Sequence, residues 1–131
     1  MEWYLAVLKK YAVFYGRARR KEYWISTLVH LAIICALTGI RIGVDYVFRS
    51  YSLPSLVLSF IASIYLMAIL VPVLAVSVRR LHDTGRTGFF LILGLIPLVG
   101  GIILLIYTLQ DSFPGENQYG PNPKETAPDA D

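Results

Sequence analysis

The stretch Arg79–Gly88 reads RRLHDTGRTG and separates two long apolar runs of the chain. It contains three arginines, the one His-Asp pair of the sequence and two glycines. Leu53–Val78 precedes it and Phe89–Leu109 follows it, and each run reaches the roughly 20 apolar residues that a helix needs to cross a bilayer. A short basic segment between two such runs is typical of a loop at a membrane surface. The stretch therefore predicts a helical membrane protein.

The composition of the whole chain supports this class. Its 131 residues suit one domain at the usual scale of about 100–200 residues. Hydrophobic residues make up 56% and charged residues 16%, where soluble domains carry about 25% charged residues. A soluble protein of this size cannot bury so much apolar surface, so the surplus must face lipid. The net charge is +3, but the basic residues flank apolar runs and form no stripe, so nucleic acid is not an expected partner.

The first residues predict an amphipathic helix over Met1–Tyr15. Trp3, Val7 and Phe14 fall near one line at helical spacing, lysines mark the polar side, and Gly16 is a natural stop. Aromatic residues with lysines favour a helix lying at the membrane interface. The alternative is a helix that packs on the chain's own transmembrane helices.

The apolar runs predict an all-α polytopic fold with three transmembrane helices. The aromatic pair Tyr23-Trp24 is typical of the membrane boundary and places the start of the first. Pro97 and Gly100-Gly101 interrupt the third, which we interpret as a kinked span, with a re-entrant hairpin as the alternative. The predicted spans are 25–46, 53–78 and 89–109.

The end of the chain is polar. Residues 110–124 form a turn-rich tail, since Pro114-Gly115 and Gly120-Pro121 are strong turn signals. We expect one membrane domain over 1–124 and a disordered acidic end over 125–131. Three roles stay open for the tail: a cap over the Arg79–Gly88 loop, a partner-docking segment or a solvated linker.

The basic residues predict the orientation in the membrane. Nine of the twelve precede the first span or lie between the second and third, so the positive-inside rule places the N-terminus and the Arg79–Gly88 loop in the cytoplasm. With three spans the tail then lies outside. A re-entrant third segment would return the tail to the cytoplasm.

Three phrases together carry a family resemblance: GRARRKEYW at 16–24, RRLHDTGRTG at 79–88 and PGENQYGPNP at 114–123. In this order and spacing they resemble the bacterial inner-membrane "domain of unknown function 805" family, over nearly the whole chain. The resemblance implies a multi-span protein of the bacterial inner membrane. It implies no activity, because the family has none assigned.

Arginines are the candidate site residues. Their guanidinium groups could bind phosphate, as in lipid headgroups, or contact a partner, and the turn at Gly85–Gly88 could add N–H donors. The alternative is that they fix orientation alone. The candidates are Arg17, Arg19, Arg20, Arg79, Arg80 and Arg86.

Other polar residues predict pairing rather than catalysis. Neighbouring residues on a helix do not face each other, so Asp83 is better placed to pair with Arg79 or Arg80 than with His82. Arg41 and Asp45, four residues apart, predict a second pair. Metal binding is not expected, because His30, Cys35 and His82 are too few and too scattered for a zinc site.

The sequence therefore predicts a non-enzymatic accessory, regulatory or assembly component of the membrane, without a cofactor. Its expected partners are anionic lipid headgroups, a membrane protein or further copies of itself. A small oligomeric transporter or channel is the alternative, based on His30 within the first span. An enzyme acting on a lipid-borne phosphate through His82 is a third hypothesis.

Overall fold

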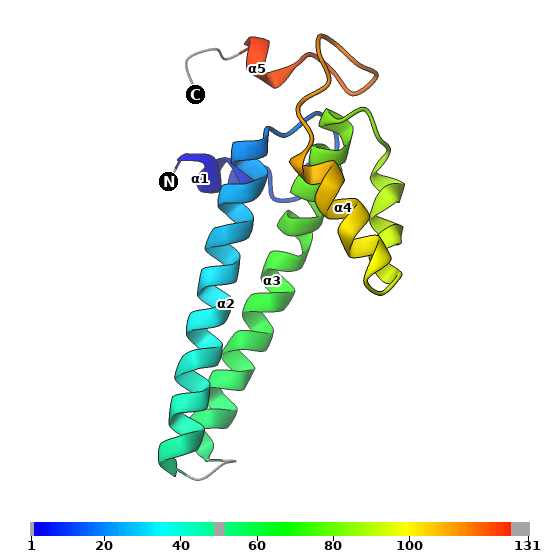
Figure 1. Ribbon diagram of the computed structural model, residues 1–131. Helices are drawn as coiled ribbons and strands as arrows, with labels where there is room; N and C mark the ends of the chain where they lie inside the picture. The colour runs from blue at the N-terminus through cyan, green and yellow to red at the C-terminus, as the bar shows by residue number, and fades with distance from the viewer. Residues whose placement is uncertain (1, 49–51, 127–131) are drawn as a thin grey trace.

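The computed structural model describes residues 2–48 and 52–126, and within these ranges it contains helices and a single isolated β-bridge. This confirms the all-α class. Figure 1 shows α2 and α3 as one long pair of helices side by side, with the other elements gathered at the end where α2 begins and α3 ends. The helices are α1 (Glu2–Lys9), α2 (Arg20–Phe48), α3 (Leu53–Asp83), the 3-10 helix η1 (Gly88–Leu95), α4 (Val99–Leu109) and α5 (Pro123–Thr126).

Helices α2 and α3 are both long and apolar enough to cross a bilayer. At about 1.5 Å per residue, their 29 and 31 residues exceed the roughly 30 Å of a hydrocarbon core. Only 6% of the most apolar window of each helix is buried inside the molecule, whereas a core helix of a soluble protein hides its apolar face. Both helices therefore present their apolar side chains to the surroundings, as membrane-spanning helices do. Polar turns at 20–22 and 79–83 extend them beyond the predicted spans 25–46 and 53–78.

Residues 88–109 do not form the kinked third span that the sequence predicts. The chain reverses at residues 96–98, and α4 returns alongside η1 (Figure 1). Leu98 has a φ of 64°, in the left-handed region that side chains other than glycine rarely adopt. Both ends of this segment lie beside α3, because Gly88 abuts Val78 and the Thr108 carbonyl accepts a hydrogen bond from Arg80 Nε at 3.1 Å. The hairpin alternative is the observed arrangement.

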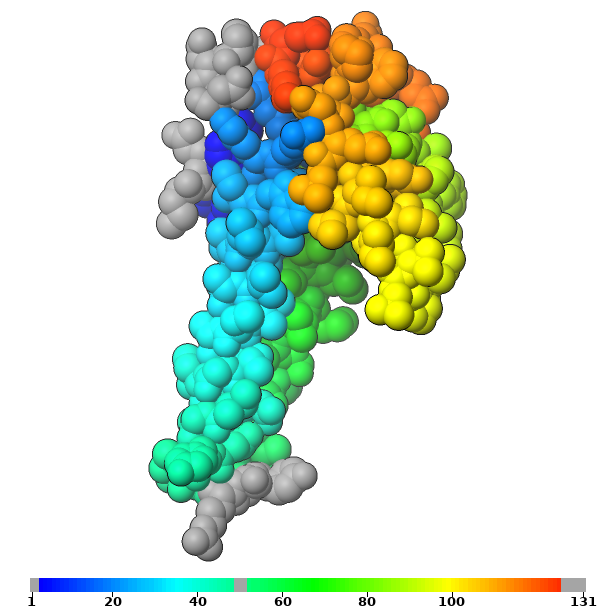
Figure 2. All heavy atoms as spheres, viewed as in Figure 1, coloured from blue at the N-terminus to red at the C-terminus, as the bar shows by residue number. Residues whose placement is uncertain are grey.

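Local sequence explains why the hairpin closes. Pro97 offers no N–H and stands where η1 ends. A β-carbon on Gly100 would lie 1.6 Å from the Leu93 carbonyl oxygen, so the two limbs approach as closely as they do because this residue is glycine. With eight residues at about 2.0 Å each in η1 and eleven at about 1.5 Å in α4, each limb is about 16 Å long, half of a bilayer core. In Figure 2 the hairpin accordingly stops well short of the far end of α2 and α3.

The polar tail packs on the same end of the molecule as the N-terminal segment (Figure 1). The Phe113 N–H donates to the Asp83 carbonyl at 2.8 Å, and Arg17 Nη1 donates to the Gly115 carbonyl at 2.8 Å. The prediction that the tail and the N-terminus lie on opposite sides of the membrane is therefore wrong. The reason is the hairpin, which brings the chain back to the end from which it left.

The two ends of the chain also differ from expectation. α1 ends at Lys9, short of the helix predicted for 1–15. One face of α1 packs on the bundle, since Val7 is fully buried against Ala18 and Val76, while its Leu5 remains exposed. One face of α1 therefore packs on the chain's own helices, which is the second of the two arrangements that the sequence allowed, and its other face stays exposed. The predicted disordered end 125–131 begins inside α5, and its residues from 127 lie outside the described ranges.

Candidate functional site

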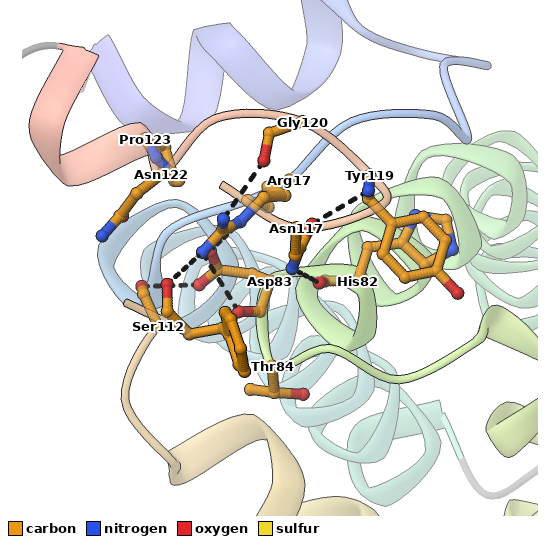
Figure 3. A network of polar contacts seen from close by, with 12 residues as sticks. Arg17, His82, Asp83, Thr84, Ser112, Asn117, Tyr119, Gly120, Asn122 and Pro123 are labelled. Carbon is orange, nitrogen blue, oxygen red and sulfur yellow. Dashed lines mark hydrogen bonds and ion pairs between the residues drawn. The ribbon is translucent and has the colours of Figure 1, made fainter. Parts of the chain in front are cut away.

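An ion pair between Arg17 and Asp83 lies at the centre of the polar end of the molecule (Figure 3). Arg17 Nε lies 2.9 Å from Asp83 Oδ1, and the two side chains are 1% and 0% exposed. The remaining guanidinium N–H groups of Arg17 donate to tail carbonyls, to Phe113 at 2.6 Å and to Gly115 at 2.8 Å. A third tail carbonyl, that of Gly120, accepts at 3.2 Å. Arg17 therefore joins the loop before α2, the end of α3 and the tail.

Asp83 is the last residue of α3 and binds three side chains. Besides Arg17, it accepts hydrogen bonds from Arg80 and from Ser112 Oγ, the latter at 2.6 Å. A carboxylate at a helix C-terminus meets the negative end of the helix dipole, so it requires nearby cations. The two arginines supply them. Removing one member of a buried ion pair typically costs about 3–5 kcal/mol, because the partner is left buried and uncompensated.

Neighbouring arginines of α3 reach different helices. Arg79 Nη1 lies 2.5 Å from Glu22 Oε1 on α2, and both side chains are buried. Arg80 Nε donates to the Thr108 carbonyl in the last turn of α4, and Arg80 also donates to the Gln110 carbonyl. Two adjacent residues thus hold the ends of α2 and α4 against α3. Together these groups form the polar cap, which consists of Arg17, Glu22, Arg79, Arg80, Asp83 and tail residues 112–123.

His82 belongs to the same turn but makes a different set of contacts. Its ring stacks on Tyr119 of the tail, with centroids 3.8 Å apart and planes 2° from parallel (Figure 3). Its Nδ1 lies 3.2 Å from the Gly16 carbonyl, and its own carbonyl accepts from Asn117 Nδ2 at 2.9 Å. The tail therefore lies over the Arg79–Gly88 loop, which is the cap that the sequence left as one of three alternatives.

The other predicted arginines lie around the edge of the polar cap. Arg19 Nε donates to the Pro123 carbonyl at 2.8 Å, and Arg20 Nε donates to the Gln110 carbonyl at 2.7 Å. Arg86 donates to Gln110 Oε1 at 2.6 Å and stands over the ring of Tyr107. The six candidate arginines are thus brought to one end. Four of them are buried in contacts within the chain: Arg17, Arg19, Arg79 and Arg80.

Arg41 and Asp45 lie elsewhere, near the end of α2 that is remote from the polar cap. Arg41 Nη1 donates to Asp45 Oδ2 at 3.0 Å. His30 lies between the two ends and bonds Tyr65 of α3 through Nδ1 at 2.7 Å. Among the described residues no group of three or more His, Cys, Asp or Glu side chains is placed to hold a metal ion.

A basic cavity of about 150 Å³ lies where α2 begins, beside the end of the tail. Asp111 lies close to it, since Lys124 Nζ is 2.6 Å from Asp111 Oδ1 and Arg20 is 3.7 Å away. The hydrogen bond from Lys124 lowers the pKa of Asp111 below its ordinary value, with a smaller contribution from the Ser112 N–H. The residues that line the cavity are Arg19, Arg20, Lys21 and Lys124.

Several of these residues were not singled out from the sequence. Glu22 binds Arg79 and Ser112 binds Asp83, and Lys21 and Lys124 complete the basic cavity. Glu22 carried a signal, because it is an acid within a run of cations just ahead of an apolar helix. Ser112 and Lys124 carried none, since their role depends on the reversal of the chain at the hairpin.

These observations define a class, a small helical membrane protein whose polar segments fold together at one end. Within that class the chain belongs to the family described as "Protein of unknown function (DUF805)", whose model matches residues 11–121. The match confirms the resemblance drawn from the three sequence phrases.

Two relatives from Escherichia coli (strain K12) match almost end to end. "Inner membrane protein YhaI" is 42% identical over 124 residues, which is 95% of this chain and 97% of the relative. "Inner membrane protein YhaH" is 39% identical over 126 residues, which is 95% of this chain and 98% of the relative. No solved structure matches the chain significantly. The bacterial inner membrane is the location that these names support.

Proposed function

We propose that the chain is a non-enzymatic accessory component of the bacterial inner membrane, with its polar cap in the cytoplasm. The distribution of basic residues supports this orientation. Arg41 and Arg49 lie in the sequence near the turn between α2 and α3, whereas the other ten basic residues belong to segments that gather at the polar cap end. The positive-inside rule places such an end in the cytoplasm, and the hairpin places the tail there as well.

The basic cavity is the observation that carries the functional proposal. Arg19, Arg20, Lys21 and Lys124 line it, and Arg20 and Lys21 belong to the first turn of α2, where the helix dipole also favours an anion. Tyr23 and Trp24 follow directly, and such residues are typical of the headgroup level. The cavity is thus suited to an anionic lipid headgroup. The buried ion pairs of the polar cap hold the surrounding segments in position and take no part in a reaction.

Lipid retention by the purified protein tests this proposal. We expect the protein to retain phosphatidylglycerol in preference to phosphatidylcholine, as measured by native mass spectrometry. In a variant with Arg20→Gln, Lys21→Gln and Lys124→Gln, affinity should fall about fivefold for each charge removed, since a basic residue near an anionic surface contributes about 1 kcal/mol. The matched control is Lys9→Gln with Lys10→Gln, which removes two exposed cations outside the cavity. Equal loss in both variants would reject the cavity, and capture of an acidic protein in place of lipid would favour a protein partner.

Reporter fusions test the orientation separately. We expect a fusion after Lys124 to be active with a reporter that works in the cytoplasm and inactive with one that works outside. A fusion in the turn between α2 and α3 should give the reverse. An external reporter active at the tail would contradict both the hairpin and the proposed orientation.

A transporter or channel built from several copies is the second candidate. The hairpin tip favours it, because Leu95 and Leu98 are more than 80% exposed and irregular backbone at membrane depth is tolerated where protein or a water-filled cavity surrounds it. A second copy of the chain would supply that surrounding. Flux in proteoliposomes that is lost in His30→Phe would support this candidate against the accessory role.

A further inference from the structure

A second cavity, of about 510 Å³, lies between the segment before α2, the end of α3 and the start of η1. This volume falls within the range of roughly 300–1,000 Å³ that is typical of small-molecule sites. It is distinct from the basic cavity and shares no residue with it. Its wall is apolar except for one imidazole and consists of Phe14, Val78, His82, Gly88, Phe89 and Ile92.

The imidazole of His82 is held in one orientation. Tyr119 stacks on its face, and the Gly16 carbonyl lies 3.2 Å from Nδ1. A carbonyl oxygen accepts but cannot donate, so Nδ1 carries the proton of this hydrogen bond. In the neutral ring Nε2 is then a hydrogen-bond acceptor. No described residue bonds Nε2, and this nitrogen is not among the fully buried polar atoms that lack a partner, so a molecule in the cavity can reach it.

The cavity has a polar end and an apolar end. His82 lies beside the polar cap, whereas Phe89 and Ile92 belong to η1, which runs from the polar cap toward the hairpin tip (Figure 1). Phe89 and Ile92 are both exposed, so the apolar end opens to the surroundings of the helices. A β-carbon on Gly88 would lie 2.9 Å from Val78 Cγ1, so η1 approaches α3 closely where these two residues line the cavity.

From this arrangement we infer that the cavity binds a long-chain fatty acid. The acid binds in its protonated form, whose carboxyl O–H donates to His82 Nε2. The hydrocarbon chain lies along Phe89 and Ile92 toward the bilayer interior. The phosphodiester and ester groups of a phospholipid offer acceptors alone and cannot make this hydrogen bond. The inference is independent of the anionic lipid proposed for the basic cavity.

Photolabelling of the full-length protein in phosphatidylcholine nanodiscs tests this site. The probes are palmitic acid with a diazirine near the end of the chain and the methyl ester of the same molecule, which lacks the O–H. We expect labelling within residues 88–95, about five- to tenfold stronger for the acid than for the ester, the ratio that one hydrogen bond gives. In His82→Phe, which keeps a ring against Tyr119, the ratio should fall to about one.

A second pair of variants keeps the test informative if His82→Phe fails to fold. Ile92→Trp fills the apolar end without touching His82 and should reduce labelling by the acid at least about fivefold. Ile106→Trp, at a similarly exposed isoleucine on α4, is the matched control and should leave labelling unchanged. Equal labelling by acid and ester in the unsubstituted protein would overturn the inference, as would labelling that Ile92→Trp does not reduce.

Discussion

The ion pairs at the two ends of the α2–α3 helix pair lie in opposite environments. At the polar cap, Arg17 and Asp83 are buried almost completely and every neighbouring segment contributes a contact. At the far end, the pair formed by Arg41 and Asp45 joins two residues of the same helix, with side chains that are 42% and 24% exposed. The Arg17–Asp83 pair connects segments that are distant in the sequence, whereas the Arg41–Asp45 pair lies within a single helix.

This difference teaches what holds the third segment in place. The hydrophobic effect does not hold it within lipid, because the hydrocarbon surroundings are as apolar as the side chains themselves, which leaves close packing and hydrogen bonds. The hydrogen bonds to side chains of α3 are of this kind: Arg80 binds the Thr108 carbonyl of α4, and Asp83 binds Ser112 of the tail. We infer that the polar cap, rather than an apolar core, determines where the hairpin and the tail lie.

The largest expected effect is that of Asp83→Asn. The substitution leaves Arg17 and Arg80 buried without a carboxylate, which should cost about 3–5 kcal/mol. The tail should detach, so limited proteolysis should cleave within 112–123 at least tenfold faster than in the unsubstituted protein. The midpoint temperature of thermal unfolding in detergent should also fall.

Asp45→Asn is the matched control at the far end. A partly exposed pair of this kind contributes about 0–1 kcal/mol, so tail proteolysis should not change. Equal sensitivity of the two variants would remove the contrast between the two ends. A compensating change, Arg17→Met combined with Asp83→Asn, should recover part of the loss if uncompensated charge is its cause.

An intermediate effect is expected from the two adjacent glycines of α4. Gly100→Ala places a β-carbon against the Leu93 carbonyl and should separate the hairpin limbs, at a cost of about 1–3 kcal/mol. Gly101→Ala meets nothing within 4 Å and should be neutral or stabilising by up to about 1 kcal/mol, because alanine favours the helix. Thermal unfolding in detergent compares them directly. The same cost in both variants would show that the limbs are not packed as described.

The sequence predicted the local elements of this fold better than their arrangement. Apolar runs of membrane length over 25–46 and 53–78 led directly to α2 and α3, because length and hydropathy are local properties. The third run is also long and apolar enough to span a bilayer. A kinked span and a hairpin differ in the backbone at Leu98 and in the fit of Gly100 against η1. Neither is visible in composition, so the kinked span and the hairpin could not be separated.

The contacts of the candidate site depend on whether residues 88–109 form a kinked span or a hairpin. Once residues 88–109 turn back, the tail meets Arg17 and the arginines of α3 acquire partners within the chain. From the sequence these arginines were equivalent members of a basic surface, and no local pattern distinguishes Arg80, which is buried, from Arg20, which is partly exposed. Pairing of Asp83 with a nearby arginine was predictable because residues three or four positions apart on a helix lie on the same face.

The smallest expected effect concerns Asp111, which lies beside the polar cap. Lys124 lowers the pKa of Asp111, so the charged form is favoured in the folded protein. The pair therefore contributes stability at pH values above the ordinary aspartate pKa of about 3.9, and this contribution is lost as the pH falls through the lowered value. Because both side chains are substantially exposed, the contribution is about 0–1 kcal/mol. Carboxyl carbon NMR titration should show a pKa below the ordinary value in the unsubstituted protein and a return toward it in Lys124→Gln, with Lys10→Gln unchanged. An Asp111 pKa that does not respond to Lys124→Gln would mean that α5 does not rest against Asp111.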